Sequence, residues 1–222
     1  MNLHTIVKTY RPPNAEGVVQ HDAVVAVSKL KAAAAAEHPA NISQIAAACS
    51  HLSSVCDAGI ADRCLAASSG AYNVLMSVLH ADNASDYIPV MLPALLSLVD
   101  GQPDILEVHG ATRVVDVLRG SGASVDSLAT ALNVIRRCCI LHEGNRQQFV
   151  ALDIIPVTSG LLKTHSSHRD VVQAACAVFS ALTLDDDVRV PFGKSHEHAK
   201  TIVIEGSALD MLLQLVSGAY SI

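Results

Sequence analysis

Residues 125–162, VDSLATALNVIRRCCILHEGNRQQFVALDIIPVTSGLL, carry three apolar stretches in a row, and short polar turns separate them. In each stretch the apolar side chains recur every three to four residues, which is the spacing of one face of an α-helix. The sequence therefore predicts a long helix at 125–142, a short helix at 144–151 and another helix at 154–163.

The same three-part pattern recurs along the chain, and a short polar dipeptide marks each unit after its longest helix. The markers are Asp62-Arg63, Pro103-Asp104, Asn145-Arg146 and Asp187-Val188. Their nearly even spacing gives a period of about 42 residues, within the range of helical repeat proteins. Such a repeat predicts a helical solenoid, because each unit buries its apolar face only against its neighbours.

Each unit is expected to contain a short first helix, a second helix and a longer, more apolar third helix. Units of three helices and about 42 residues are typical of armadillo repeats, whereas HEAT repeats usually have two helices and are the nearest alternative. The predicted fold is an all-α, right-handed armadillo (ARM) superhelical solenoid without strands. The expected first helices are 59–68, 102–109 and 144–151; the second are 71–80, 110–119 and 154–163; the third are 42–56, 86–99, 125–142 and 168–184.

The boundaries of the array follow from the same pattern. Residues 1–16 show no apolar period and are expected to be poorly ordered, while 17–217 form the array, with about four to five units that are incomplete at both ends. The last interval, from Asp187 to Gly206, is more than twice as long as the matching interval from Asp62 to Gly70. This difference predicts an inserted loop at 190–200.

Composition supports helices and excludes several classes of protein. Hydrophobic residues make up 50% of the 222 residues, yet aromatic residues make up only 3% and there is no Trp. Small aliphatic side chains suit close packing between helices. The formal net charge of −6 gives no basic surface for a nucleic acid, so none is expected as a partner.

The sequence also predicts a protein that neither crosses nor binds a membrane. Its longest apolar stretch, Ile88–Val99, is much shorter than the roughly 20 residues that a bilayer span needs. The amino-terminal residues lack the apolar core of a signal peptide. The six cysteines contain no C-x-x-C pair and are expected to be reduced and buried, so the expected location is the cytosol, with the nucleus as a second possibility.

Two stretches resemble one family of armadillo proteins. They are LTLDDDVRVPFGKSHEHAK at 182–200 and CCILHEGNRQQF at 138–149, and both are similar to the armadillo-repeat-containing protein 6 family. The resemblance covers most of 17–217 and implies a non-enzymatic armadillo protein of the cytosol, belonging to a family whose members are longer. It implies no catalytic residues and no cofactor.

The third helices are expected to line a concave surface that binds a partner protein or an extended peptide. Well-known armadillo receptors place an asparagine late in each third helix, and the repeat period puts Ser54, Ser97, Arg137 and Ser180 near that position. Without an asparagine ladder or Trp, binding of nuclear-import signals is not expected. A segment that binds nothing by itself, within a larger scaffold, remains a further alternative.

Arg136 and Arg137 are unusual in an apolar helix, and one of them is expected to emerge on the groove side. A guanidinium there would favour a carboxylate or phosphate of a ligand. The alternative is that the arginine pairs with Glu143 or Asp126 and only joins neighbouring units.

Two clusters could carry metal or thiol chemistry. The inserted loop contains Phe192, His196 and His198. Its histidines could combine with the carboxylates of 185–187 (Asp185, Asp186 and Asp187) in a metal-binding or enzymatic site, and this is the alternative function. The competing interpretation is a solvated loop. Cys138 and His142 are four residues apart and could share a helix face, although ordinary core cysteine is the simpler interpretation.

The core and one exposed surface can also be predicted. The core is expected to contain Ala131, Val134, Ile135 and Cys138 of one third helix and Ala174, Ala177, Val178 and Ala181 of the next. The last helix is apolar nearly all round and is expected to allow self-association. Its apolar residues are Leu209, Met211, Leu212, Leu213, Leu215 and Val216.

Overall fold

A computed structural model describes residues 21–36, 41–80, 84–204 and 208–219 of the chain. These residues form α-helices and two short 3₁₀ helices, with no strand in the described ranges. The predicted all-helical armadillo-type solenoid is confirmed. The segment 1–16, expected to be poorly ordered, lies outside the described residues.

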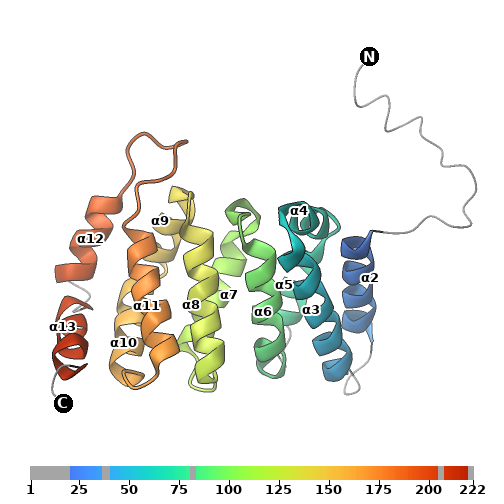
Figure 1. Ribbon diagram of the computed structural model, residues 1–222, viewed down its shortest axis with the longest axis horizontal. Helices are drawn as coiled ribbons and strands as arrows, with labels where there is room; N and C mark the ends of the chain where they lie inside the picture. The colour runs from blue at the N-terminus through green and yellow to red at the C-terminus, as the bar shows by residue number, and fades with distance from the viewer. Residues whose placement is uncertain (1–20, 37–40, 81–83, 205–207, 220–222) are drawn as a thin grey trace, which may run out of the picture.

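The third helices lie side by side and form one layer of the solenoid (Figure 1). Helix α2, expected as the second helix of an earlier unit, packs beside the first of them. Residues one period apart therefore touch: Cys49 Sγ and Met91 Sδ are 3.4 Å apart. The helices are α2 (Asp22–Ala35), α3 (Asn41–Ala58), α6 (Ile88–Val99), α8 (Val125–Cys139) and α11 (Arg169–Leu182).

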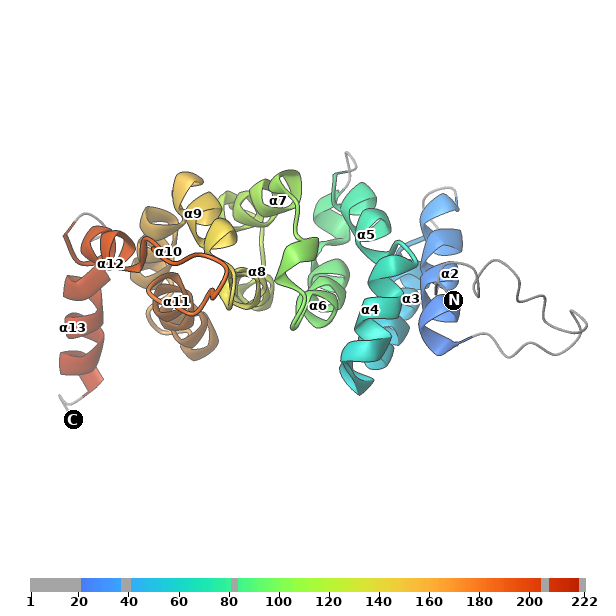
Figure 2. The ribbon, with the colours of Figure 1, turned by 90° about the horizontal axis from the view of Figure 1, so that it is seen from above.

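The second helices before the last form another layer behind the third helices, as the view from above shows (Figure 2), and the last one lies at the C-terminal end of the array. The first helices connect the two layers at one edge. The second helices are α5 (Ala71–Leu79), α7 (Val108–Arg119), α10 (Ile154–Thr164) and α13 (Ala208–Ala219). The first helices are α4 (Ile60–Ser68), α9 (Glu143–Ala151) and α12 (Ser195–Ile204), and the 3₁₀ helices are η1 (Ala84–Asp86) and η2 (Pro103–Ile105).

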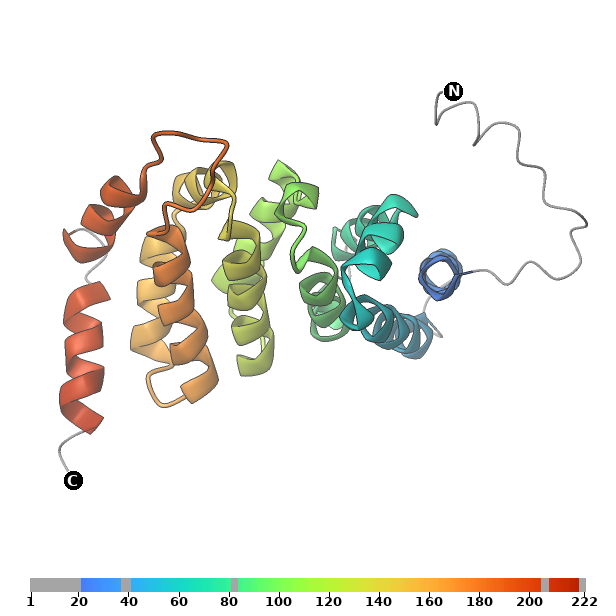
Figure 3. The ribbon, with the colours of Figure 1, turned by 45° about the horizontal axis from the view of Figure 1, so that its top comes forward.

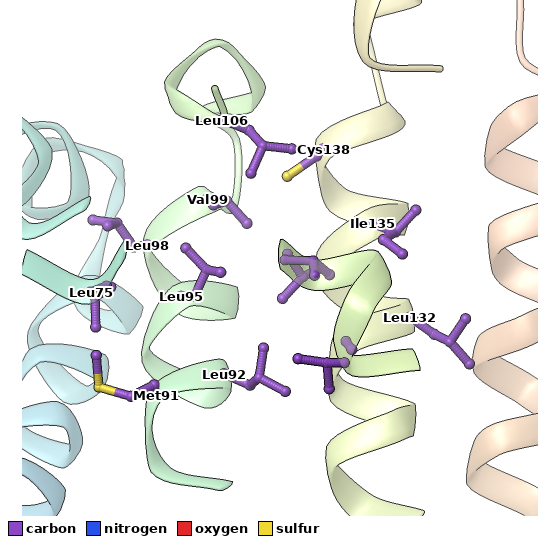
Figure 4. Close-up of a cluster of buried hydrophobic side chains, with 14 of the residues drawn as sticks. Leu75, Met91, Leu92, Leu95, Leu98, Val99, Leu106, Leu132, Ile135 and Cys138 are labelled. Atoms are coloured by element: carbon purple, nitrogen blue, oxygen red, sulfur yellow. The ribbon is translucent and has the colours of Figure 1, made fainter. Parts of the chain in front are cut away.

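The core is one continuous apolar cluster that runs from unit to unit. In Figure 4, Met91 and Leu98 of α6 point toward Leu75 of α5, whereas Leu132 and Ile135 of α8 point away from α6 toward the next unit. Each third helix thus has apolar side chains for both neighbours. Burial on two sides explains why the third helices are the most apolar segments of the sequence.

The prediction that Ala177 lies in the core is wrong. The other seven members of that set are buried, but Ala177 is only partly buried, and the fully buried alanine of this turn is Ala175. The face of α11 that packs inward is therefore rotated relative to the predicted one. A run of small residues hides this rotation, because Ala and Cys tolerate both inward and outward positions.

Two predicted helix boundaries are also wrong. The segment 102–109 is not a first helix: it contains the short helix η2 and the first residues of α7, which begins at Val108. Gly110 consequently lies inside α7, where an added Cβ would collide with the hydroxyl of Tyr72. That hydroxyl accepts a hydrogen bond from the backbone N–H of Glu107, 3.0 Å away, so the glycine makes room for a contact between units.

Helix α8 ends at Cys139 rather than at residue 142. Leu141 has a φ of 55°, in the left-handed region, and the ring of His142 accepts a hydrogen bond from the N–H of Asn145 at the start of α9. Cys138 and His142 therefore do not share a helix face. The prediction of that pair failed because a left-handed residue ends the apolar period without any glycine to signal it.

The insertion lies earlier than predicted and is partly helical. An irregular segment follows α11 and runs to Lys194, and α12 then begins at Ser195 in the place of a first helix. His196 and His198 are accordingly helical residues and not part of a loop. In Figure 3 this segment, called here the 184–194 loop, reaches over the end of α9 before it returns to α12.

Candidate functional site

The outward side of α3, α6, α8 and α11 is the surface on which the sequence places a partner. We call it the third-helix face. Ser54 and Ser180 are exposed there, Ser97 is partly exposed, and none of the three hydroxyls forms a hydrogen bond within the described part of the chain. Other helix hydroxyls, such as those of Ser77 on a second helix and Thr130 on α8, donate to carbonyls of their own helix.

The two arginines at the end of α8 have different surroundings. Arg137 pairs with Asp100, at a distance of 2.5 Å between Nη1 and Oδ1. Asp100 also lies 3.8 Å from Arg63, so one carboxylate at the end of α6 contacts an arginine of its own unit and one of the next unit. The prediction that Arg137 pairs with Glu143 or Asp126 is wrong, because its partner is Asp100. The prediction that such a pair joins neighbouring units is correct. Arg136 is partly exposed and has no hydrogen bond or ion pair among the described residues.

A repeated contact explains why arginine belongs to two of the marker dipeptides. Arg63 donates to the carbonyl oxygen of Cys56, and Arg146 donates to that of Cys139, seven residues earlier in each case. Both carbonyls lie in the last turn of a third helix, where backbone acceptors lack partners within the helix. The arginine therefore ties α4 to α3 and α9 to α8, in each case a first helix to the third helix that precedes it.

Arg146 is also the centre of a buried ionic cluster. Its side chain is completely buried and contacts Glu143 at 2.8 Å and Asp186 at 2.6 Å. Glu143 is 1% exposed and also accepts hydrogen bonds from the side chain of Gln147 and the backbone N–H of Lys194. Burial opposes ionisation of Glu143, but hydrogen bonds from Gln147, Arg146 and Lys194 outweigh it and lower its pKa.

A second set of contacts holds the middle of the 184–194 loop. Asp187 accepts hydrogen bonds from the N–H of Glu143 and from Arg189, whose guanidinium also reaches Asp104 at 2.7 Å. Asp104 lies 3.1 Å from His142 as well. The hydrogen bond from Arg189 lowers the pKa of Asp104, and Arg189 together with the N–H of Glu143 holds the pKa of Asp187 well below its usual range.

These contacts also stabilise the unusual backbone at Leu141. Its N–H donates to Asp186 and its carbonyl accepts from Arg189. A non-glycine residue with positive φ is strained, and such strain persists where the surroundings determine the backbone on both sides. We call this whole arrangement, which joins 139–146 to 184–194, the clasp. It consists of the two stretches that carry the family resemblance.

The clasp should make stability depend on pH. Because its carboxyl pKa values are lowered in the folded state, it stabilises fully above the unfolded values of about 3.9 to 4.3, and this stabilisation is lost progressively as the pH falls from them through the lower folded-state values. We expect Asp187→Asn to lower the urea midpoint at pH 7, and we expect its difference from the parent to shrink progressively as the pH falls below about 4, with part of it remaining at pH 3 because the folded-state pKa of Asp187 lies well below its usual range. Asp57→Asn, at an exposed position without an ion pair among the described residues, should show no such convergence.

The loop that the clasp holds presents two large apolar side chains to solvent. Val188 is 98% exposed and Phe192 is 92% exposed. Gly193 lets the loop approach Glu143, because an added Cβ would lie 3.2 Å from that carboxylate. The clasp thus buries the charged side chain of Asp187, whereas the apolar side chains of Val188 and Phe192 in the same loop are exposed to solvent.

The residues of the proposed metal site do not form one cluster within the described ranges, and Asp185 is exposed. Asp186 and Asp187 take part in the clasp, His196 is exposed, and His198 is buried with its Nδ1 3.1 Å from the carbonyl oxygen of Leu182. No group of three or more side chains of the metal-binding types gathers within the ranges that the structure describes. The arrangement gives no support to the metal-binding or enzymatic alternative.

Most of the thiols behave as core residues, but the expectation that all six cysteines are buried is wrong for Cys64, which is exposed, and for Cys176, which is only partly buried. Cys138 and Cys139 are fully buried, and burial raises both thiol pKa values; the same effect raises the pKa of Cys49 to about 12. Protonated thiols are poor nucleophiles. No helix in the described ranges has the length and apolar character required to span a bilayer.

On the last helix, Leu209 and Leu213 are exposed. Met211 and Leu212 are partly buried, and the side chains of Leu215 and Val216 lie outside the described set. Self-association through this helix stays a prediction.

The sequence did not predict a hollow of about 430 Å³ between α2 and α3. Four alanines form its walls, and Lys29, Gln44 and His51 line it. The sequence feature that indicates this hollow is the alanine run at 32–36. Alanine favours a helix, but its small side chain fills little of the space between that helix and the neighbouring one. The ion pair between Arg146 and the partly buried Asp186 was also missed, since it connects residues 40 positions apart.

Comparisons with known proteins agree with the repeat architecture. No family model matches the chain. Armadillo repeat-containing protein 6 of Pongo abelii and of Homo sapiens are each 34% identical over 221 residues, which is 96% of this chain and 43% of each relative. The Drosophila melanogaster homolog is 31% identical over 170 residues, which is 74% of this chain and 36% of that protein.

The chain spans less than half the length of these relatives. The similarity nevertheless extends over nearly all of its residues and includes both stretches of the clasp. The chain belongs to the armadillo repeat-containing protein 6 family.

Proposed function

We propose that this chain is part of a non-enzymatic protein-interaction scaffold, and that an extended segment of a partner protein binds along its third-helix face. Armadillo repeat proteins are in general such scaffolds, because stacked units create a long continuous surface. The observation that carries the proposal is the set of outward polar groups on this face, Ser54, Ser97, Arg136 and Ser180, which form no hydrogen bond within the described part of the chain.

The 184–194 loop supports the same interpretation. It lies at one end of the third helices and contacts the end of α8 through Leu141. Phe192 can bury a large apolar area against a partner, and the clasp keeps the loop ordered before binding, which reduces the entropy lost on association. We include Phe192 in the proposed surface and leave His196 and His198 outside it. The proposed location is the cytosol or the nucleus, and the proposed partner is a protein and not a nucleic acid.

Site-specific photocrosslinking in cells tests this proposal. A photoreactive phenylalanine analogue at Ser97, Ser180 or Phe192 is expected to give discrete protein adducts. The same analogue at Ser77, an exposed serine of the second-helix layer, is the control and is expected to give few. Mass spectrometry identifies the adducts. Adducts formed from Ser77 but not from the three test positions would contradict the proposal.

A further inference from the structure

The hollow between α2 and α3 combines apolar walls with polar groups that have no partner in the described structure. Nδ1 of His51 is buried and forms no hydrogen bond with any described residue. Lys29 and Gln44 are exposed and form no ion pair or hydrogen bond within the same ranges. The other lysine of α2, Lys31, donates instead to the carbonyl oxygen of Ser69 at 2.8 Å. The residues that line the hollow therefore hold unused donors next to a space of about 430 Å³.

The chemistry of the lining selects an anionic group. Lys29 supplies a positive charge, Gln44 supplies amide N–H donors, and the ring of His51 supplies a donor in the appropriate tautomer. No carboxylate stands among the described residues that line the hollow. The alanine walls accommodate the methylene groups of a side chain such as glutamate, whose carboxylate would then reach the three polar groups.

The hollow adjoins the third-helix face. His51 and Ser54 are three residues apart on α3, so they are neighbours on the helix surface. Farther along this face, Arg136 on α8 is a second cation without a partner among the described residues, whereas Asp100 already neutralises Arg137. The face thus offers one unused positive charge near each end of the segment from α2 to α8.

The two charges are separated by a predictable length of peptide. Neighbouring helices pack about 8–10 Å apart, so the hollow and Arg136 are about 20–25 Å apart across α3, α6 and α8. An extended chain advances about 3.3 Å per residue, which makes this distance about six to eight residues.

We propose that the third-helix face binds an acidic peptide segment of a partner protein, with one carboxylate in the hollow at Lys29 and His51 and another at Arg136. This inference rests on the proposed function and adds the chemistry and spacing of the ligand. The formal net charge of −6 disfavours a long polyanion such as a nucleic acid, whereas a short segment needs only these two local contacts.

Fluorescence polarisation with synthetic probes tests the proposal on the full chain. The probes are labelled peptides of Ala and Ser that carry two Glu-Glu pairs, and the same peptides with Lys-Lys pairs. An intermediate spacer between the pairs, of about seven residues, matches the expected separation, while a spacer half as long falls short of it and one half again as long exceeds it. We expect the intermediate glutamate probe to bind most tightly and the lysine probes not to bind. Lys29→Glu and Arg136→Glu are each expected to weaken binding of that probe at least tenfold.

Lys163→Glu is the matched control, since it makes the same change of charge at an exposed residue of α10 in the other layer. It should change the affinity less than twofold. Equal weakening by Lys163→Glu, no preference for the glutamate probes, or equally tight binding of a short oligothymidine would each overturn the inference.

The inference and the proposed function fail in different ways. Crosslinks from Ser97 to a cellular partner whose binding is unchanged by Lys29→Glu and Arg136→Glu would keep the third-helix face as a binding surface and overturn the acidic ligand. Crosslinks confined to Ser77 would overturn the proposed function and, with it, the inference.

Discussion

Replacing Arg146 with Met is expected to lower the free energy of unfolding by about 3–5 kcal/mol, which is the range for breaking a buried ion pair from one side. The guanidinium is completely buried and binds Glu143, Asp186 and the carbonyl oxygen of Cys139. Its loss leaves Glu143 buried next to an apolar side chain and leaves a backbone acceptor without a donor. Urea unfolding followed by far-ultraviolet circular dichroism measures the effect.

Two variants separate the cost of an uncompensated charge from the loss of packing. Adding Glu143→Gln to Arg146→Met removes the buried charge, so we expect the double variant to be more stable than Arg146→Met alone by about 1 kcal/mol or more. Arg119→Met is the surface control, since Arg119 is 41% exposed in its pairs with Asp116 and Asp153, and it should cost about 1 kcal/mol or less.

The loss should also be visible locally. Removal of Arg146 takes one of two contacts from Asp186, which holds the start of the 184–194 loop and, within the described ranges, keeps only the hydrogen bond from the N–H of Leu141. Hydrogen exchange of the loop amides is then expected to quicken more than exchange in α3 or α6, because stability in a solenoid depends on neighbouring units. An unfolding free energy within about 1 kcal/mol of the parent protein, with unchanged exchange in the loop, would show that the clasp does not stabilise this region.

Replacing Ala175 with Asp is expected to cost about 3–5 kcal/mol, because a carboxylate would enter a site with no exposed surface. Ala177→Asp, two residues farther along α11, is the matched comparison. Ala177 is partly exposed, so its carboxylate can remain hydrated, and the expected cost is about 1 kcal/mol or less.

Thermal unfolding of the two variants decides which face of α11 packs inward. A much larger fall in melting temperature for Ala175→Asp than for Ala177→Asp is the expected result. The reverse order would mean that the inward face is the one that the sequence pattern predicts and that the rotation of α11 described above is wrong.

The difference between these two alanines shows where sequence patterns lose information. The buried set on α8, with Val134, Ile135 and Cys138, was predicted correctly because polar or charged residues separate its apolar positions. On α11 the stretch from Ala174 to Ala177 offers four small residues in succession, which fit an inward or an outward position equally well. Helix rotation is then decided by contacts with the neighbouring helices.

In the candidate site, too, some features follow from the sequence and others only from the structure. The third-helix face and the outward position of Ser54 and Ser180 follow from the period, but the partner of Arg137 does not. That arginine pairs with Asp100, 37 residues earlier, because stacking of the units brings the ends of α6 and α8 together. The sequence-based choices, Glu143 and Asp126, were near in the chain and are not its partners in the described structure.

The sequence by itself determined the helical class, the repeat of about 42 residues and the order of helices within a unit, all of which depend on local periodicity that every unit repeats in its own residues. The tertiary structure alone decided the clasp, the outward display of Val188 and Phe192, and the hollow at Lys29 and His51. Each depends on side chains from different units or helices, and their meeting is set by the rotation and offset of packed helices, which no local pattern encodes.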